Sequence, residues 1–348
     1  MLILKPVTSF LSLIIDFVYR VRRLLFGHHV FSSTELIPKT ISVGNLELGG
    51  TGKTPFTIWL ATFLEDLEYT GVILTRGYKR ESVEKSSVQL TPENNHTINV
   101  SDVGDEPLLI SRKLQSSSVV VGADRLKGYF ERPVIHTDDF VLLDDGHQHL
   151  RIRRDLNIIL INSSTYPEKF KCVPAGSLRE GLTSLMCADI IIFTKCDQSP
   201  SENELALKRM IHKYTKPDSV WGRVKFSPSY FQNIKTKEKK LLIDLSSKEC
   251  GAFCGIAKPD HFYNTLDQLN LNIIRKVTFD NHHKFKESSY RKINKLENVK
   301  SLICTEKDAV KIDPQRIKGD IFSLVNQVVF LEGESKIKDK IKKILTYE

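Results

Sequence analysis

Residues 41–55 read ISVGNLELGGTGKTP. An apolar run typical of a buried strand leads into a glycine-rich turn, and apolar residues at helical spacing follow it. The glycines are Gly49, Gly50 and Gly52. They let backbone N–H groups approach an anion closely, and the start of the following helix adds its positive end. Lys53 can reach the β- and γ-phosphates of a nucleotide, and the Thr54 hydroxyl can bind Mg²⁺.

The segment departs from the strict phosphate-loop pattern G-x-x-x-x-G-K-[ST] at one place. The first glycine of that pattern would fall at position 47, which is Glu47 here. The match is to a G-G-x-G-K-T variant, and the neighbouring strand and helix supply the context that the motif requires. We therefore expect nucleotide binding at this loop.

Short apolar runs alternate with helical patterns on both sides of the loop. The expected strands are 40–43, 72–75, 119–121, 140–143, 158–161 and 190–194 in the first half, and 241–245, 273–277, 302–305 and 328–331 in the second. Such alternation predicts an α/β fold, a mostly parallel sheet of the P-loop NTPase type flanked by helices.

Other segments predict the organisation of the chain. We expect a short helix at 259–269 and a C-terminal helix at 334–347 that packs on the body. Residues 82–101 read as a loop or hairpin, and residues 199–208 and 235–240 as connections. A domain boundary is placed near residue 210.

The composition sets broad limits on function. The 348 residues include 51 Lys and Arg against 42 Asp and Glu, a formal charge of +9, which favours nucleotide phosphates, acidic lipids or nucleic acid as partners. No basic patch interleaved with aromatic residues stands out, so nucleic acid is not expected. The six cysteines form no C-x-x-C pair and read as thiols of a reducing compartment.

The N-terminus predicts contact with a membrane surface. Residues 7–26 read VTSFLSLIIDFVYRVRRLLF, and the uncharged stretch 6–15 is only ten residues long. A spanning helix needs about 20 mostly apolar residues. Residues 1–30 therefore predict an amphipathic helix in the membrane interface, with its arginines at lipid phosphates. A helix packed on the protein's own core is the alternative.

Two acidic pairs follow strand or loop positions. Asp144 and Asp145 end the expected strand 140–143, where a phosphate-loop enzyme needs a carboxylate for Mg²⁺, although an Asp-Gly turn of a hairpin would look alike. Asp105 and Glu106 stand before a helical pattern, which by itself favours a helix cap.

The histidines and one short motif leave further functions open. The histidines are His147, His149, His282 and His283, and their spacing gives only weak support to a zinc site. A histidine beside a phosphoryl-transfer site more plausibly orients or deprotonates an acceptor hydroxyl. The sequence TKCD at 194–197 is similar to the guanine-binding signature of GTPases, although a simple turn at the end of a strand would look alike. A nucleotide switch that binds a protein, or an ATPase stimulated by nucleic acid, is thus the competing interpretation.

Taken together, these segments resemble the tetraacyldisaccharide 4′-kinase family, the lipid A 4′-kinases. The matching pieces are VGNLELGGTGKTP at 43–55, TRGY at 75–78, GDEP at 104–107, VGADR at 121–125, LDDGHQH at 143–149, PAGSLRE at 174–180, FDNHHKF at 279–285 and TEKDAVK at 305–311. They span nearly the whole chain in one order.

The resemblance implies a phosphate-loop core domain at 31–210, a smaller C-terminal α/β domain at 211–348 and a cleft between them. It implies transfer of the ATP γ-phosphate to the 4′-hydroxyl of a tetraacyldisaccharide 1-phosphate. The implied location is the cytoplasmic face of the inner membrane, with peripheral or monotopic attachment through the N-terminal helix.

The resemblance also implies roles for individual residues. Asp105, His282 and Lys53 match catalytic positions, with Asp105 and His282 as a pair that takes the proton of the sugar hydroxyl. Contacts to ATP are implied for Asn45, Gly49, Gly50, Thr51, Gly52, Lys53, Thr54 and Tyr78. Glu106, Arg125, Arg179 and Glu180 fall in segments that line the substrate site, and Thr54, Asp144 and Asp145 are the implied Mg²⁺ ligands.

One departure concerns the histidine pair. The family often reads D-H-H where this chain has Asn281, His282 and His283. Asn281 carries no charge that would raise the basicity of a histidine, and Asp280 is the neighbouring carboxylate. His283 is therefore the rival of His282 for the partner of Asp105.

Overall fold

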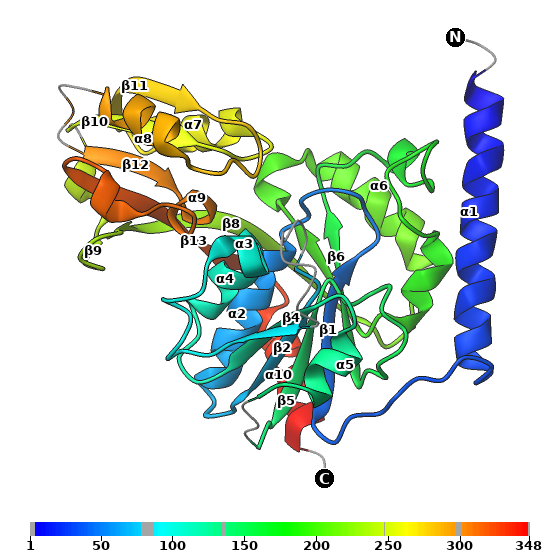
Figure 1. Cartoon of the computed structure of the whole chain (residues 1–348). Coiled ribbons are helices and arrows are strands. Elements are labelled where there is room, and N and C mark those ends of the chain that lie inside the picture. Colours follow the sequence, from blue (N-terminus) through cyan, green and yellow to red (C-terminus); the bar gives the residue numbers. More distant parts are fainter. Residues whose placement is uncertain are drawn as a thin grey trace.

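The computed structural model describes residues 4–77, 87–133, 137–246, 248–296, 299 and 301–346. Within these ranges the strands form one thirteen-stranded sheet in the order β11-β10-β12-β13-β8-β7-β6-β1-β5-β2-β4-β3, with β9 paired to β8 (Figure 1). The strands are β1 Lys39–Asn45, β2 Gly71–Thr75, β3 Ser87–Leu90, β4 Ser118–Gly122, β5 Phe140–Asp144, β6 Leu156–Asn162, β7 Ile190–Thr194, β8 Val220–Asn233, β9 Lys239–Lys240, β10 Glu249–Cys254, β11 Asn272–Thr278, β12 Ser301–Thr305 and β13 Asp320–Glu332.

Helices cover both faces of the sheet, as an α/β fold requires. The α-helices are α1 Leu4–Gly27, α2 Lys53–Glu65, α3 Val100–Val103, α4 Asp105–Ser111, α5 Arg125–Phe130, α6 Ser201–His212, α7 Pro259–Gln268, α8 Glu287–Asn294, α9 Glu306–Ala309 and α10 Glu334–Thr346. One buried cluster joins α2, α4 and α10 to the first-half strands, and another joins α6 and the 3₁₀ turn η2 Leu182–Cys187 to β6 and β7. The expected mostly parallel sheet flanked by helices is confirmed.

The strand β1 lies at the centre of the first half. It pairs in parallel with β5 on one side and with β6 on the other. The loop after β1 therefore opens at a point where the strand order changes direction, which is where open α/β sheets bind their ligands. Because β5 runs parallel to both of its neighbours, the hairpin alternative for Asp144, Asp145 and Gly146 is wrong.

The strands of the second half continue the same sheet through the long antiparallel pair β8 and β13. Two further buried clusters lie here, one with α7 and one with α8, and their buried residues all fall between 231 and 324. Figure 1 shows these elements as a separate part of the molecule. The C-terminal helix α10 returns to the first half, where Ile337 and Ile341 are fully buried beside α2, so the prediction that it packs on the body is confirmed.

Two expectations about local structure are wrong. Residues 241–245 form the 3₁₀ turn η4 Leu242–Leu245 and not a strand, because the Asp244 carboxylate accepts the N–H of Leu241 at 2.8 Å and closes a local cap. Residues 199–208 are not a simple connection, because they contain the start of α6. The buried residues Glu204, Leu207 and Ile211 recur at helical spacing in α6. Because Glu204 is charged, they do not form an apolar pattern that the sequence would reveal.

No strand was expected at β8 or β10, and β3 lies within residues 82–101, where a loop or hairpin was expected. The strand β8 contains Pro228 and charged residues, which normally count against a strand. Pro228 lies opposite Asn326, where the register between β8 and β13 shifts. A missing N–H is tolerated at such an irregularity, and only the pairing partner reveals this.

The predicted N-terminal helix is present as α1, which lies along the outside of the molecule (Figure 1). One side of α1 contacts the body: the Ser12 hydroxyl donates to the Cys172 carbonyl at 2.6 Å, and Ile15 packs near α6. The other side exposes apolar side chains, namely Val7, Phe10, Leu11, Leu13, Ile14, Phe17, Val18 and Leu24. Among the described residues, no helix is long and apolar enough to cross a bilayer.

Candidate active site

The phosphate loop lies between the end of β1 at Asn45 and the start of α2 at Lys53. Gly52 has φ +88°, and a Cβ at this position would lie 2.2 Å from the ring of Phe226. Gly49 has φ +109°. Gly52 has a positive φ and no space for a side chain, whereas Gly49 needs glycine for its positive φ alone. This turn therefore depends on glycine at both positions.

Lys53 points back across the loop. Its Nζ donates to the Asn45 side-chain carbonyl at 3.0 Å and lies 3.5 Å from Asp145 Oδ1. Asn45 is fully buried and donates in turn to the Glu47 carbonyl at 2.9 Å. The lysine is thus held at the mouth of the loop, ready to exchange these partners for a phosphate.

Two residues at the end of β7, Thr194 and Lys195, hold the loop from the other side. The Thr194 hydroxyl donates to the Thr51 carbonyl at 2.8 Å, and Lys195 Nζ donates to the Gly50 carbonyl at 2.5 Å. Burial lowers the pKa of Lys195, and the nearby charge of Lys258 lowers it further. These residues belong to the TKCD motif, so that motif stabilises the backbone of the phosphate loop in this protein.

Glu47, which replaces the first glycine of the strict pattern, has a structural partner of its own. Its buried carboxylate accepts the Asn162 N–H at 2.9 Å and the Thr165 hydroxyl at 2.6 Å. Burial raises the pKa of this carboxyl group. The departure from the pattern therefore ties the start of the loop to the end of β6.

Asp144 and Asp145 lie beside the loop, at the end of β5, and differ in their surroundings. Asp144 accepts the hydroxyls of Thr57 and Thr75 at 3.1 and 2.9 Å. Burial raises its pKa, and the charges of Asp145 and Glu106 raise it further. A divalent cation would relieve this accumulation of negative charge.

Three cations surround Asp145, namely Lys53, Arg179 and Arg125. Arg179 Nη1 donates to the carboxylate at 2.9 Å, and Arg125 Nη1 donates to the Asp145 carbonyl at 3.2 Å. Burial alone would raise the pKa of Asp145, but these cations lower it below its ordinary value. Asp145 Oδ1 is buried and accepts no hydrogen bond, and its nearest charged partner is Lys53 Nζ at 3.5 Å.

The catalytic pair expected from the sequence is formed. Asp105 is the first residue of α4; its Oδ1 accepts the N–H of Glu106 at 3.0 Å, and its Oδ2 lies 2.9 Å from His282 Nδ1. His283 instead contacts the Ser289 hydroxyl at 2.8 Å and stacks on Phe279. The geometry therefore assigns the partner of Asp105 to His282. The helix-cap interpretation of Asp105 is wrong, because Gly104 is the cap residue of α4 and Asp105 lies in its first turn.

The TEKDAVK motif joins the second half to α4. Lys307 pairs with Glu106, and Lys113 pairs with Glu306 at 2.6 Å. Asp308 is fully buried and accepts the N–H of Gly255, whose carbonyl accepts the N–H of His282. This motif thus positions the turn that carries His282.

The remaining predicted residues fall in different places. Glu180 is buried against α1 and pairs with Arg23 at 2.6 Å, while its neighbour Arg179 faces Asp145. His147 is fully buried and lies 3.0 Å from Arg23 Nη2. Burial lowers its pKa well below the ordinary value. Tyr78 lies outside the described residues.

The described part of the chain contains no group of three or more His, Cys, Asp or Glu residues that could hold a metal ion. This gives the zinc hypothesis no support. Mg²⁺ has other requirements, because it commonly uses only one or two carboxylates together with substrate phosphates and water.

The family model described as tetraacyldisaccharide-1-P 4′-kinase matches residues 4–346. The chain belongs to this family. The tetraacyldisaccharide 4′-kinase of Halothermothrix orenii is 29% identical over 335 residues, 93% of this chain and 87% of that protein. The tetraacyldisaccharide 4′-kinase of Elusimicrobium minutum is 31% identical over 325 residues, which cover 92% of this chain and 84% of that protein.

A solved structure agrees with this membership. The crystal structure of the LpxK of Aquifex aeolicus in complex with ATP matches with a TM-score of 0.80 and 28% identity, covering 96% of this chain and 97% of that one. As a member of the 4′-kinase family the chain is an ATP-dependent kinase, so the switch and the nucleic-acid-stimulated ATPase are set aside.

Several contacts of this kinase site were not expected from the sequence. Arg23, Gln148, Thr194 and Lys195 all touch the loop or a residue that holds it. The TKCD motif was the one available signal, and it pointed to base recognition. Arg23 lies 157 positions from Glu180, and Gln148 lies 103 positions from Asn45, so no local pattern could reveal these contacts.

Replacing Lys195 with Gln should weaken ATP binding about tenfold, because the Gly50 carbonyl loses a charged donor and the loop loosens. Lys213→Gln removes the same charge from an exposed position and should leave the dissociation constant nearly unchanged. Titration of both variants with ATP by calorimetry makes the comparison, and equal affinities would contradict the bracing role of Lys195.

Proposed function

We propose that this kinase transfers the γ-phosphate of ATP to the 4′-hydroxyl of a tetraacyldisaccharide 1-phosphate, a step of lipid A biosynthesis. The observation that carries the proposal is the contact between Asp105 and His282, because the neighbouring Glu106 is close enough to Asp144 for its charge to raise the pKa of that carboxyl group. A base for an acceptor hydroxyl near the carboxylates beside the phosphate loop is the arrangement that a kinase requires.

The phosphate loop binds and orients the triphosphate. The amides of Gly49, Gly50, Thr51 and Gly52 and the start of α2 would approach its oxygens, and Lys53 would leave Asn45 for the transferred phosphoryl group. Such fixed positive groups stabilise the charge that develops during transfer, and they need no reorganisation at that moment. Asn45 and Tyr78 remain proposed nucleotide contacts.

Thr54, Asp144 and Asp145 would hold Mg²⁺. Asp145 Oδ1, which accepts no hydrogen bond, and Asp144, whose pKa is raised by burial and by neighbouring negative charge, fit a cation at this place. When bound, Mg²⁺ would neutralise negative charge on the β- and γ-phosphate oxygens. Two hydroxyls and one cluster of cations already orient the two carboxylates, so the chain presents them without rearrangement.

Asp105 and His282 would orient the acceptor hydroxyl and remove its proton. The hydrogen bond between them fixes the histidine ring and can stabilise the charge that follows proton uptake. Glu106 and Arg125 are proposed to contact the sugar or its phosphate, as is Arg179. For Glu180 the burial against Arg23 favours an indirect contribution over substrate contact.

The chain is proposed to divide into a phosphate-loop domain and a smaller C-terminal domain. The separate buried clusters between 231 and 324 support this division. Residue 210 lies inside α6, which packs on the first half, so a boundary within β8 fits the packing better than one near 210.

We propose that the exposed apolar side of α1 enters the interface of the inner membrane from its cytoplasmic face. The substrate carries acyl chains, and an enzyme held at the surface can act on its head group while those chains stay in the bilayer. Eight apolar side chains on one short helix are an unusual exposed patch for a soluble surface, and Arg20 is 52% exposed for contact with lipid phosphates.

The direct test uses the purified protein, γ-labelled ATP, Mg²⁺ and a tetraacyldisaccharide 1-phosphate in mixed micelles. We expect labelled lipid from the wild-type protein and a loss of about 100-fold or more with Lys53→Ala, because the charge on the transferred group is no longer compensated. Nucleotide binding without transfer to the lipid would rule out the proposed reaction.

The roles of the two histidines can be separated in the same assay. Asp105→Asn and His282→Gln should each lower kcat by about 10²- to 10⁴-fold while ATP affinity stays the same, because only the acceptor loses its base. His283→Gln is the matched control, since this ring contacts Ser289 and not Asp105. A kcat for His282→Gln equal to that of His283→Gln would contradict the assignment.

Membrane contact is tested by sedimentation with vesicles that contain acidic phospholipid. Replacing Phe10 and Phe17 with Ser should reduce binding by about tenfold or more, because two large apolar groups no longer enter the acyl region. The matched control is Phe130→Ser on α5, where the side chain is 61% exposed. Equal loss in both variants would refute a specific role for α1.

A further inference from the structure

The segment 172–180 lies between α1 and the phosphate loop. On the α1 side, Ser12 Oγ donates to the Cys172 carbonyl at 2.6 Å and accepts the N–H of Ala175 at 3.0 Å. At the end of the segment, Arg23 Nε donates to Glu180 Oε2 at 2.6 Å. The segment is thus attached to α1 at both of its ends.

The same segment is bonded to the phosphate loop on its other side. The Leu48 N–H donates to the Ser177 carbonyl, and the Arg179 N–H donates to the Leu46 carbonyl, both at 2.7 Å. Between them Glu47 and Leu178 form an isolated antiparallel bridge. Every shift of residues 177–179 therefore acts on the first half of the loop.

Glu180 adds a second connection through side chains. Its Oε1 accepts the Gln148 amide at 2.8 Å, and the same Gln148 nitrogen donates to the Asn45 carbonyl at 3.1 Å. Asn45 is the residue that holds Lys53. A chain of four hydrogen bonds thus leads from Arg23 on α1 to the lysine of the phosphate loop.

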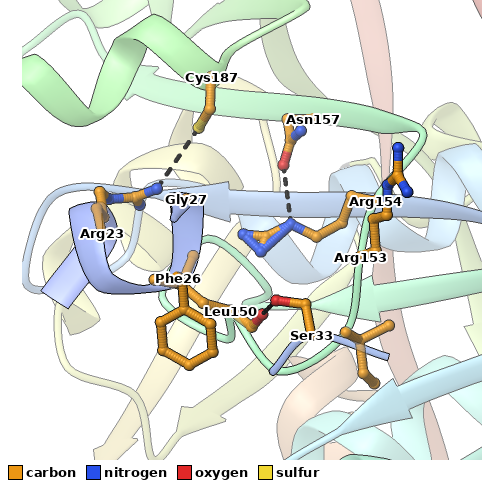
Figure 2. A pocket seen from close by; sticks show the side chains of 10 residues that line it. Arg23, Phe26, Gly27, Ser33, Leu150, Arg153, Arg154, Asn157 and Cys187 are labelled. Carbon is orange, nitrogen blue, oxygen red and sulfur yellow. Dashed lines mark hydrogen bonds between the residues drawn. The ribbon is translucent and has the colours of Figure 1, made fainter. Parts of the chain in front are cut away.

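This series of hydrogen bonds depends most on the ion pair between Arg23 and Glu180. The Glu180 side chain is 2% exposed, and a buried carboxylate that loses its partner is strongly destabilised. His147 lies 3.3 Å from Glu180, but burial, the largest cause, and the charge of Arg154 still lower its pKa when Arg23 is replaced, so it is a poor substitute for the arginine. Figure 2 shows Arg23 projecting from α1 towards Cys187, inside the body of the protein.

We propose that segment 172–180 fixes the phosphate loop in the position set by the docking of α1, and that Arg23 and Glu180 are positioning residues for the kinase reaction. The proposal relies on the nucleotide site of the proposed function but not on its lipid acceptor. In this arrangement the helix that faces the membrane also stabilises the binding-competent loop.

The test compares two arginine variants of α1 in the full-length protein. Arg23→Gln should weaken ATP binding about tenfold and lower kcat by a similar factor, because the buried Glu180 carboxylate loses its charged partner and no longer holds Gln148 in place. Arg20→Gln removes the same charge from the same helix, but its ion pair is with Asp16 of α1 itself, so ATP affinity should stay near wild type. Arg23→Lys should recover part of the loss.

Two further readouts separate positioning from general destabilisation. Hydrogen exchange of Arg23→Gln should increase more in residues 46–54 and 172–180 than in the rest of the sheet, although the loss of the buried ion pair also lowers the unfolding midpoint. Ser12→Ala, which removes contacts at the other end of the segment, should weaken ATP binding in the same direction even if Arg23→Gln does not fold. ATP affinities of Arg23→Gln and Ser12→Ala equal to that of Arg20→Gln would overturn the proposal. Because ATP binding needs no lipid acceptor, this outcome is distinct from a failure of the proposed lipid reaction.

Discussion

A loop that offers its backbone N–H groups to phosphate cannot use those same groups to hold its own shape, so other contacts must fix it. In this kinase the loop carbonyls of Gly50 and Thr51 are held by Lys195 and Thr194. Residues 46–48 are held by the segment 177–179. The need to hold the loop explains much of the architecture of the site, because the elements that contact the loop also carry side chains of the site.

The second requirement is balance between buried charges. Asp144, Asp145 and Glu106 concentrate negative charge at the end of β5, and Lys53, Arg125 and Arg179 oppose it. Hydroxyls hold Asp144 at the end of β5, and its pKa is raised. Cations surround Asp145, the next residue, and its pKa is lowered. A site of this kind can accept a nucleotide with little rearrangement, because the incoming charges replace pairs that already exist.

Much of the fold could be predicted from local sequence patterns. The six strands expected in the first half are present because buried parallel strands are continuous apolar runs. The strand β8 and the helix α6 were missed, because their burial depends on partners far away in the chain: β13 for the first, and the sheet face at β6 and β7 for the second. The turn at 241–245 was mistaken for a strand because Asp244 closes a local cap that outweighs an apolar run.

The sequence by itself determined the phosphate loop, the order of the motifs and the membership of the 4′-kinase family, because each depends on residues close together or in a fixed order. It left open which histidine meets Asp105 and what Glu180 contacts. Only the tertiary structure decided these, since His282 and Asp105 are 177 positions apart, and Arg23 and Glu180 are 157 apart. Contacts over such distances exist only once the sheet has brought the strand ends together.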